Sequence, residues 1–176
     1  MRPYMMIWVC CAMTLLCACR PIQPSVRQEY PKEYNLAYQE IYKQCYDSVP
    51  YNVVALDLYS EGLTLNEKHR IQGTGYNLYL SDIFCSDTVL TAGTYRSDTS
   101  ATPFTFLPGR DYEGTPHGIY ILRIEEDKVS SIQVVDSGSF VLRNDSLLFT
   151  LYYHINYNNY TYKPTFSGAL IPWVKQ

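Results

Sequence analysis

The chain has 176 residues, a formal net charge of −3 and only 18% charged residues, yet it contains 18 tyrosines. Its length is typical of a single domain, and an acidic balance without any basic stripe argues against a nucleic-acid partner. After Cys19, no apolar run is long enough to cross a membrane as a helix.

Residues 1–18 predict an export signal that is removed from the mature protein. Arg2 is the one charged residue of this segment, and Tyr4–Ala18 carries no charge. The uncharged run is about 15 residues long, whereas a membrane-spanning helix needs roughly 20. A basic start, a short apolar core and small residues before a cut point are typical of secretory signals.

Cys19 is the predicted lipidation site. Leu16-Cys17-Ala18-Cys19 resembles the bacterial lipobox, in which an apolar, a variable and a small residue precede an obligatory cysteine. The resemblance implies that the Cys19 thiol carries diacylglycerol, that the signal is cut before it, and that the new amine is acylated. Membrane lipid is thus the predicted partner, because each buried methylene contributes about 0.8 kcal/mol. The alternative is an ordinary signal peptide with a chance cysteine.

Two segments follow the lipidation site before the main domain. Residues 19–30 combine two prolines with polar residues and show no periodicity, which predicts a lipidated linker. Residues 31–47 predict a short amphipathic helix, because Pro31 suits a first helical turn. Apolar residues then recur every third or fourth position, as on one helical face; they are Tyr34, Ala37, Tyr38, Ile41, Tyr42 and Cys45. We expect this stripe to pack on the core, with ligand stacking as the alternative.

Cys45 and Cys85 are the cysteines that remain after Cys19 is assigned to lipid. An oxidising periplasm would permit a disulfide between them. Closing a loop of about 40 residues could contribute roughly 3–4 kcal/mol in the chain-entropy model. Two independent buried thiols are the alternative.

Residues 50–176 predict an all-β domain. Apolar and polar residues alternate in runs such as Val54–Leu58, Tyr76–Leu80 and Leu147–Tyr153, and turn residues separate the runs. This pattern predicts about nine short strands. Short strands joined by frequent turns favour an antiparallel β-sandwich, with a small β-barrel as the alternative.

Three stretches of this domain resemble a family of small Bacteroidetes-type all-β lipoproteins. They are Gly75–Asp82 (GYNLYLSD), Leu90–Tyr95 (LTAGTY) and Ser137–Val141 (SGSFV), the last leading to Phe166–Leu170 (FSGAL). The resemblance covers roughly residues 52–171 and departs from the family pattern at Thr91 and Pro164. No activity is assigned to that family, so the resemblance implies fold and compartment only.

The residues after Cys19 bear on the face of the membrane. Arg20–Ser25 contains no acidic residue, whereas surface export in bacteria of this type tends to accompany an acidic patch at that position. The predicted location is therefore the outer membrane, with the domain on the periplasmic face. Surface exposure is the alternative.

Residues 152–162 form the best candidate for a ligand surface, because they hold five tyrosines and three asparagines. Stacking faces beside amide hydrogen-bonding groups suit a glycan or a protein ligand. The candidate ligand residues are Tyr152, His154, Tyr157, Tyr160 and Tyr162. A solvated hairpin with cross-strand aromatic pairs is the alternative interpretation.

No pattern predicts catalysis, a metal or a cofactor. His69, His117 and His154 share no metal-ligand spacing, and Asp111 with Glu113 offers too few oxygens for calcium. Hydrolase and phosphate-binding motifs are absent from the sequence. The predicted function is a lipid-anchored, non-catalytic binding or structural module of the envelope. The alternatives are a barrel that carries a small apolar ligand and an unrecognised hydrolase.

Overall fold

The computed structural model describes residues 29–42, 50–86, 89–155 and 157–173. These residues form an all-β domain, as predicted, and no helix occurs among them. It follows that no helix in the described part of the chain could span a bilayer.

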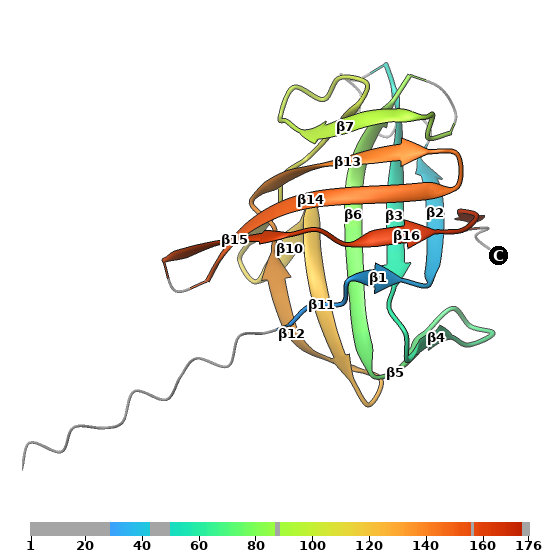
Figure 1. The fold of residues 1–176 in the computed structure, drawn as a ribbon, viewed down its shortest axis with the longest axis vertical. Coiled ribbons are helices and arrows are strands. Elements are labelled where there is room, and N and C mark those ends of the chain that lie inside the picture. Colours follow the sequence, from blue (N-terminus) through green and yellow to red (C-terminus); the bar gives the residue numbers. More distant parts are fainter. Residues whose placement is uncertain (1–28, 43–49, 87–88, 156, 174–176) are drawn as a thin grey trace, which may run out of the picture.

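Thirteen strands build one sheet that curls, so that two groups of strands face each other (Figure 1). Its path runs through β1 (Glu33–Tyr34), β16 (Thr165–Ser167), β14 (Ser146–Ile155), β13 (Ser137–Arg143), β7 (Gly93–Ser97), β8 (Thr105–Phe106), β6 (Gly75–Cys85), β3 (Asn52–Tyr59), β2 (Leu36–Tyr42) and β17 (Ile171–Pro172). One group lies around β14 and the other around β3. Off this path, β15 (Asn158–Tyr162) pairs with β14, and β6 pairs with β11 (Ile119–Glu125), which pairs with β12 (Lys128–Val134). Two separate hairpins are β4 (Leu63–Leu65) with β5 (Ile71–Gly73), and β9 (Arg110–Tyr112) with β10 (Thr115–His117).

Side-chain alternation explains which face of each strand is buried. In β14, Leu147, Phe149 and Leu151 are buried while Leu148 and Tyr152 are exposed, because successive side chains of a strand point to opposite faces. The β13–β14 turn is tight because Asn144 adopts a positive φ of 48°, a conformation that asparagine tolerates better than most residues. Local sequence therefore fixes this hairpin.

Aromatic rings fill the core at the bend where the sheet passes from β13 through β7 to β8. The Phe140 ring stacks on Tyr95 with a centroid distance of 4.6 Å and lies 5.6 Å from Phe106 and 5.4 Å from Phe149. The Tyr95 hydroxyl donates to the carbonyl of Thr91 at 3.0 Å. The polar end of this buried ring is therefore satisfied, as buried hydroxyls require.

The predicted helix over residues 31–47 is wrong where the structure describes it. Residues 33–34 and 36–42 form β1 and β2, and β2 pairs antiparallel with β3 along its whole length. Ala37 and Ile41 pack on the core, whereas Tyr38 faces the other side of the sheet. Tyrosine and isoleucine favour strands, and β3 offers hydrogen-bonding groups along the edge to which β2 adds. The helical spacing of apolar residues contains no information about this distant partner. Residues 43–47 lie outside the described residues.

Both the number and the direction of the strands differ from expectation. Bends divide single runs of chain into two strands, since only Asn35 separates β1 from β2, and Lys163 with Pro164 separates β15 from β16. Most pairs are antiparallel, but β1–β16, β7–β8 and β17–β2 are parallel. One bent segment, β1–β2, thus contacts both groups of strands, because β1 lies on β16 and β2 lies on β3.

We expect Phe140→Ala to lower the free energy of unfolding by about 3–5 kcal/mol, because it leaves a cavity among three other rings. Leu148→Ala, on the exposed face of the neighbouring strand, should change it by less than about 0.5 kcal/mol. Urea unfolding followed by tyrosine fluorescence measures both values. Equal losses in the two variants would contradict this account of the core.

Candidate functional site

The β14–β15 hairpin divides the predicted ligand residues between two faces. Its register places Tyr153 opposite Tyr160 and Leu151 opposite Tyr162, so Tyr160 and Tyr162 share the inner face. Tyr152 and His154 project from the outer face, and Tyr157 is fully exposed in the turn between the strands. Of the five candidates, the structure brings together only Tyr160 and Tyr162.

On the outer face, the His154 ring contacts a carboxylate instead of a tyrosine. Its Nδ1 lies 2.5 Å from Asp136 Oδ2, and both side chains are about half exposed, at 58% and 45%. A pair this exposed contributes little to stability. We therefore place the candidate site on the inner face.

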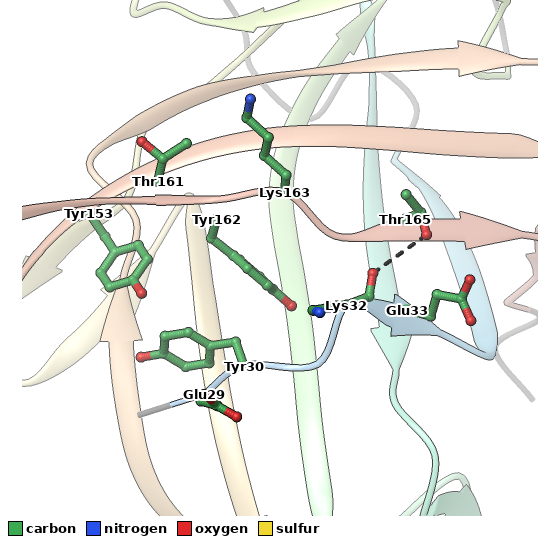
Figure 2. A pocket seen from close by; sticks show the side chains of 9 residues that line it. All are labelled: Glu29, Tyr30, Lys32, Glu33, Tyr153, Thr161, Tyr162, Lys163 and Thr165. Atoms are coloured by element: carbon green, nitrogen blue, oxygen red, sulfur yellow. Dashed lines mark hydrogen bonds between the residues drawn. The ribbon is translucent and has the colours of Figure 1, made fainter. Parts of the chain in front are cut away.

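The inner face borders a cleft of about 1000 Å³. Figure 2 shows it between the N-terminal segment and the run of chain from β15 to β16, with the rings of Tyr30, Tyr153 and Tyr162 gathered between them. The lining residues are Glu29, Tyr30, Lys32, Glu33, Tyr153, Thr161, Tyr162, Lys163 and Thr165. The cleft therefore combines aromatic surface with two lysines and two glutamates.

Tyr30 is the central ring of this site. Its ring centroid lies 5.6 Å from that of Tyr76 on β6, 5.5 Å from Tyr153 on β14 and 5.3 Å from Tyr162 on β15. One side chain thus bridges the two groups of strands. Its hydroxyl is buried and finds no hydrogen-bond partner among the described residues, which costs roughly 1–3 kcal/mol. Burial also raises the pKa of Tyr30 above its ordinary value.

Hydrogen bonds from the opposite wall hold the N-terminal segment in place. The Tyr162 hydroxyl donates to the Pro31 carbonyl at 2.6 Å and shares a hydrogen bond with the Tyr34 hydroxyl at 3.1 Å. The Thr165 amide donates to the Lys32 carbonyl at 2.9 Å. Burial raises the pKa of Tyr34 and of Tyr162, so both hydroxyls stay neutral and act as hydrogen-bonding groups.

A second cluster of polar and aromatic groups lies on the outer face of β2, β3, β6 and β11. Tyr38, Asp57, Tyr79 and Tyr120 follow one another across these four strands. The buried Asn77 amide donates to Asp57 Oδ1 at 3.0 Å. Burial raises the pKa of Asp57 to about 6, against the opposing effect of this hydrogen bond. This carboxyl group therefore titrates close to neutral pH.

The remaining predicted residues stand apart from the cleft. Cys85 is buried, and burial raises the pKa of its thiol to about 12, so the thiol is a poor nucleophile. Cys19 and Cys45 lie outside the described residues, and the lipidation and the disulfide stay predictions. Asp111 accepts the Gly114 amide at 2.8 Å in the β9–β10 turn. Within the described ranges no three His, Cys, Asp or Glu side chains group as metal ligands.

Sequence reasoning missed the N-terminal wall of the cleft. Tyr30 and Lys32 lie in the predicted linker and helix, but Tyr30 contacts Tyr76, Tyr153 and Tyr162, and the Lys32 carbonyl accepts from Thr165 on β16. These partners are distant in the chain. A local signal was nevertheless present, because Tyr30 is a large aromatic residue at the end of an otherwise polar linker. Such a residue is more often an anchor on a folded domain than a part of a spacer.

We expect Asp57 to make stability depend on pH between about 4 and 6. Its pKa of about 6 in the folded state exceeds the value of about 4 for an exposed aspartate, so folding favours the protonated form. This contribution is present below pH 4 and is lost as pH rises through 6, on the order of 3 kcal/mol at most.

Urea unfolding at several pH values between 4 and 7 measures the effect. Asp57→Asn should remove this decline, whereas Asp145→Asn, in an exposed turn, should keep the wild-type profile. Parallel profiles for wild type and Asp57→Asn would show that Asp57 does not titrate in this range.

Comparison of the whole chain with protein-family models, curated proteins and solved structures finds no match. Function must therefore be argued from the chemistry of a site, because a fold alone does not specify an activity. In the described part of the chain, the cleft around Tyr30 is the site that combines volume, aromatic surface and an unsatisfied polar group.

Proposed function

We propose that this protein is a lipid-anchored, non-catalytic binding module of the bacterial outer membrane, and that its ligand occupies the cleft around Tyr30. The observation that carries the proposal is the cleft itself, with about 1000 Å³ of space and a buried Tyr30 hydroxyl that lacks a partner. Ligand sites are typically concave, lined by aromatic groups and supplied with few polar groups.

The lining of the cleft suits a glycan or a protein segment better than a single charged ion. Lys32 and Lys163 carry positive charge, while Glu29 and Glu33 carry negative charge. Opposite charges around one opening give no net field for an anion or a cation. The half-buried Tyr30 ring offers apolar area beside these charged groups, a combination that binds ligands of mixed polarity.

The two alternative functions find less support. A carrier needs an empty lumen, but Tyr95, Phe106, Phe140 and Phe149 fill the interior with contacting rings. A hydrolase needs a convergent acid and base, and Asp57 faces tyrosines on the outer side of the sheet. We also favour a partly open β-barrel over a sandwich, because the bent segment β1–β2 joins both groups of strands.

The predicted anchor would bring the cleft close to the membrane. The chain enters the described domain at Glu29, which lines the cleft. The ten peptide steps from Cys19 to Glu29 span at most about 36 Å when fully extended. A tethered cleft is thus restricted to ligands near the membrane, which fits an envelope component on the periplasmic face.

Cys19→Ala should abolish the incorporation of labelled palmitate, because without the thiol no diacylglycerol can be attached and the signal is not cut before residue 19. We expect wild-type protein to carry the label and to migrate on a gel as the cut form, and Cys19→Ala to carry no label and to keep its signal. Cys17→Ala, within the signal but not at the cut, serves as the matched control and should behave like wild type. Labelled Cys19→Ala would contradict the proposed anchor.

Tyr30→Ala should weaken ligand retention at least tenfold, because it removes the central ring of the cleft. The probes are immobilised polysaccharides and immobilised heptapeptides, and retention of the detergent-solubilised protein is the measurement. Tyr112→Ala, at an exposed position on the β9–β10 hairpin, is the matched aromatic control and should bind normally. Equal retention of both variants, or no retention of the parent, would contradict the proposal.

A further inference from the structure

Among the described residues, strand β15 pairs with β14 along one edge only, and hydrogen-bond alternation identifies the groups on its other edge. The Phe149 amide donates to the Pro164 carbonyl at 3.0 Å, so these two residues form a hydrogen-bonded pair. In an antiparallel ladder such pairs alternate with non-bonded ones. With the observed register, Tyr160 and Tyr162 direct their backbone groups toward β14. Thr161 and Lys163 direct theirs away from it.

Strand β1 confirms this alternation farther along the same edge. Thr165 follows Thr161 and Lys163 at the same two-residue interval, so its backbone groups also point outward. Its amide donates to the Lys32 carbonyl at 2.9 Å. Here β1 lies parallel to β16, with Glu33 opposite Thr165. The edge is therefore able to hold an added parallel strand, since it already holds one over two residues.

The N-terminal segment leaves this edge where the cleft begins. Before Lys32 the chain turns inward, because the Tyr30 ring inserts among Tyr76, Tyr153 and Tyr162. In the described parts of the chain, no backbone hydrogen bond reaches the outward groups of Thr161 or Lys163. Both residues are exposed and line the cleft. Figure 2 shows Thr161 and Lys163 on one segment and Tyr30 and Lys32 on the other, with the Tyr162 side chain between them.

We propose that the cleft binds an extended peptide of another protein, which adds as a strand to the free edge of β15. This inference rests on the proposed function and specifies its ligand as a protein segment. Outward N–H and C=O groups recur at every second residue of β15, a spacing of roughly 6.6–6.8 Å. An extended backbone presents complementary groups at the same period, which is the basis of strand addition. A sugar chain has no such repeat of donors and acceptors.

The two faces of β15 indicate which side chains the added peptide would carry. Tyr160 and Tyr162 face inward beside Tyr153, so every second peptide residue would meet aromatic surface. The intervening residues would lie beside Thr161 and Lys163 on the outer face. A cross-strand pair of opposite charges is favourable, so acidic residues fit next to Lys163. The expected ligand alternates apolar and acidic residues over four or five positions.

The test measures binding of an array of heptapeptides that alternate valine or tyrosine with glutamate, using fluorescence polarisation with the detergent-solubilised protein. We expect at least one peptide to bind, and N-methylation of every second amide on one edge to abolish its binding. N-methylation of the amides on the opposite edge should have little effect. Failure of every peptide, or equal binding of the two methylated forms, would overturn the proposal.

Thr161→Pro removes the outward N–H without removing a bond to β14, and edge strands tolerate such a proline. Thr161→Ala keeps the N–H and loses the side chain. Proline should weaken binding at least tenfold more than alanine does, and equal effects would count against strand addition. Circular dichroism checks that Thr161→Pro is folded, and the methylated peptides test the proposal even if it is not.

Two further measurements separate this inference from its alternatives. Amide exchange at Thr161 and Lys163 should be fast without peptide and slow with it; slow exchange without peptide would show that the chain's own linker occupies the edge. Polysaccharide retention that depends on Tyr30, together with failure of all peptides, would overturn strand addition and leave the proposed function intact. Retention of either probe that ignores Tyr30→Ala would overturn both.

Discussion

The stacking of the Phe140 ring on its aromatic neighbours is the interaction on which the curled sheet depends. Phe140 on β13 contacts Tyr95 on β7, Phe106 on β8 and Phe149 on β14. These strands form the bend that turns one group of strands back over the other. Flat rings with contacting faces set the spacing of the layers, because interiors pack as densely as organic crystals. At this bend the sheet can neither flatten nor collapse further.

At the opposite end of the curled sheet, the Tyr30 ring sets the spacing between the two groups of strands. There the two groups of strands diverge, and the Tyr30 ring lies between Tyr76 on one side and Tyr153 and Tyr162 on the other. Filling the opening with this ring draws the N-terminal segment inward, away from β15. Because the Tyr30 ring lies in the core, the segment before Lys32 turns away from β15. The backbone edge at Thr161 and Lys163 is therefore exposed. Core packing and the candidate binding edge share one cause.

Elements with a local origin could be predicted from the sequence, and those with a distant partner could not. The β13–β14 hairpin follows from alternating residues around Asn144, and the pairing of Tyr160 and Tyr162 on one face follows from the same rule. The tyrosine spacing of residues 31–47 predicts a helix, whereas pairing with β3 makes residues 36–42 a strand. Tyr30 could not be predicted as a site residue for a similar reason, since the rings that it contacts belong to β6, β14 and β15. Alternation within β14 also separates Tyr152 and His154 from the cleft.

The attachment of the N-terminal segment has a mechanical consequence. Any pull on the amino-terminal side of the chain reaches Tyr30 first, then the Pro31 carbonyl held by Tyr162, and only then the Lys32–Thr165 bond. Force would thus pull the Tyr30 ring out of the core before it broke the hydrogen bonds between β1 and β16. A domain fastened in this way resists tension in stages, and the first stage changes the shape of the cleft. The residues that hold the N-terminal segment, among them Tyr30, Tyr162 and Thr165, also line the cleft.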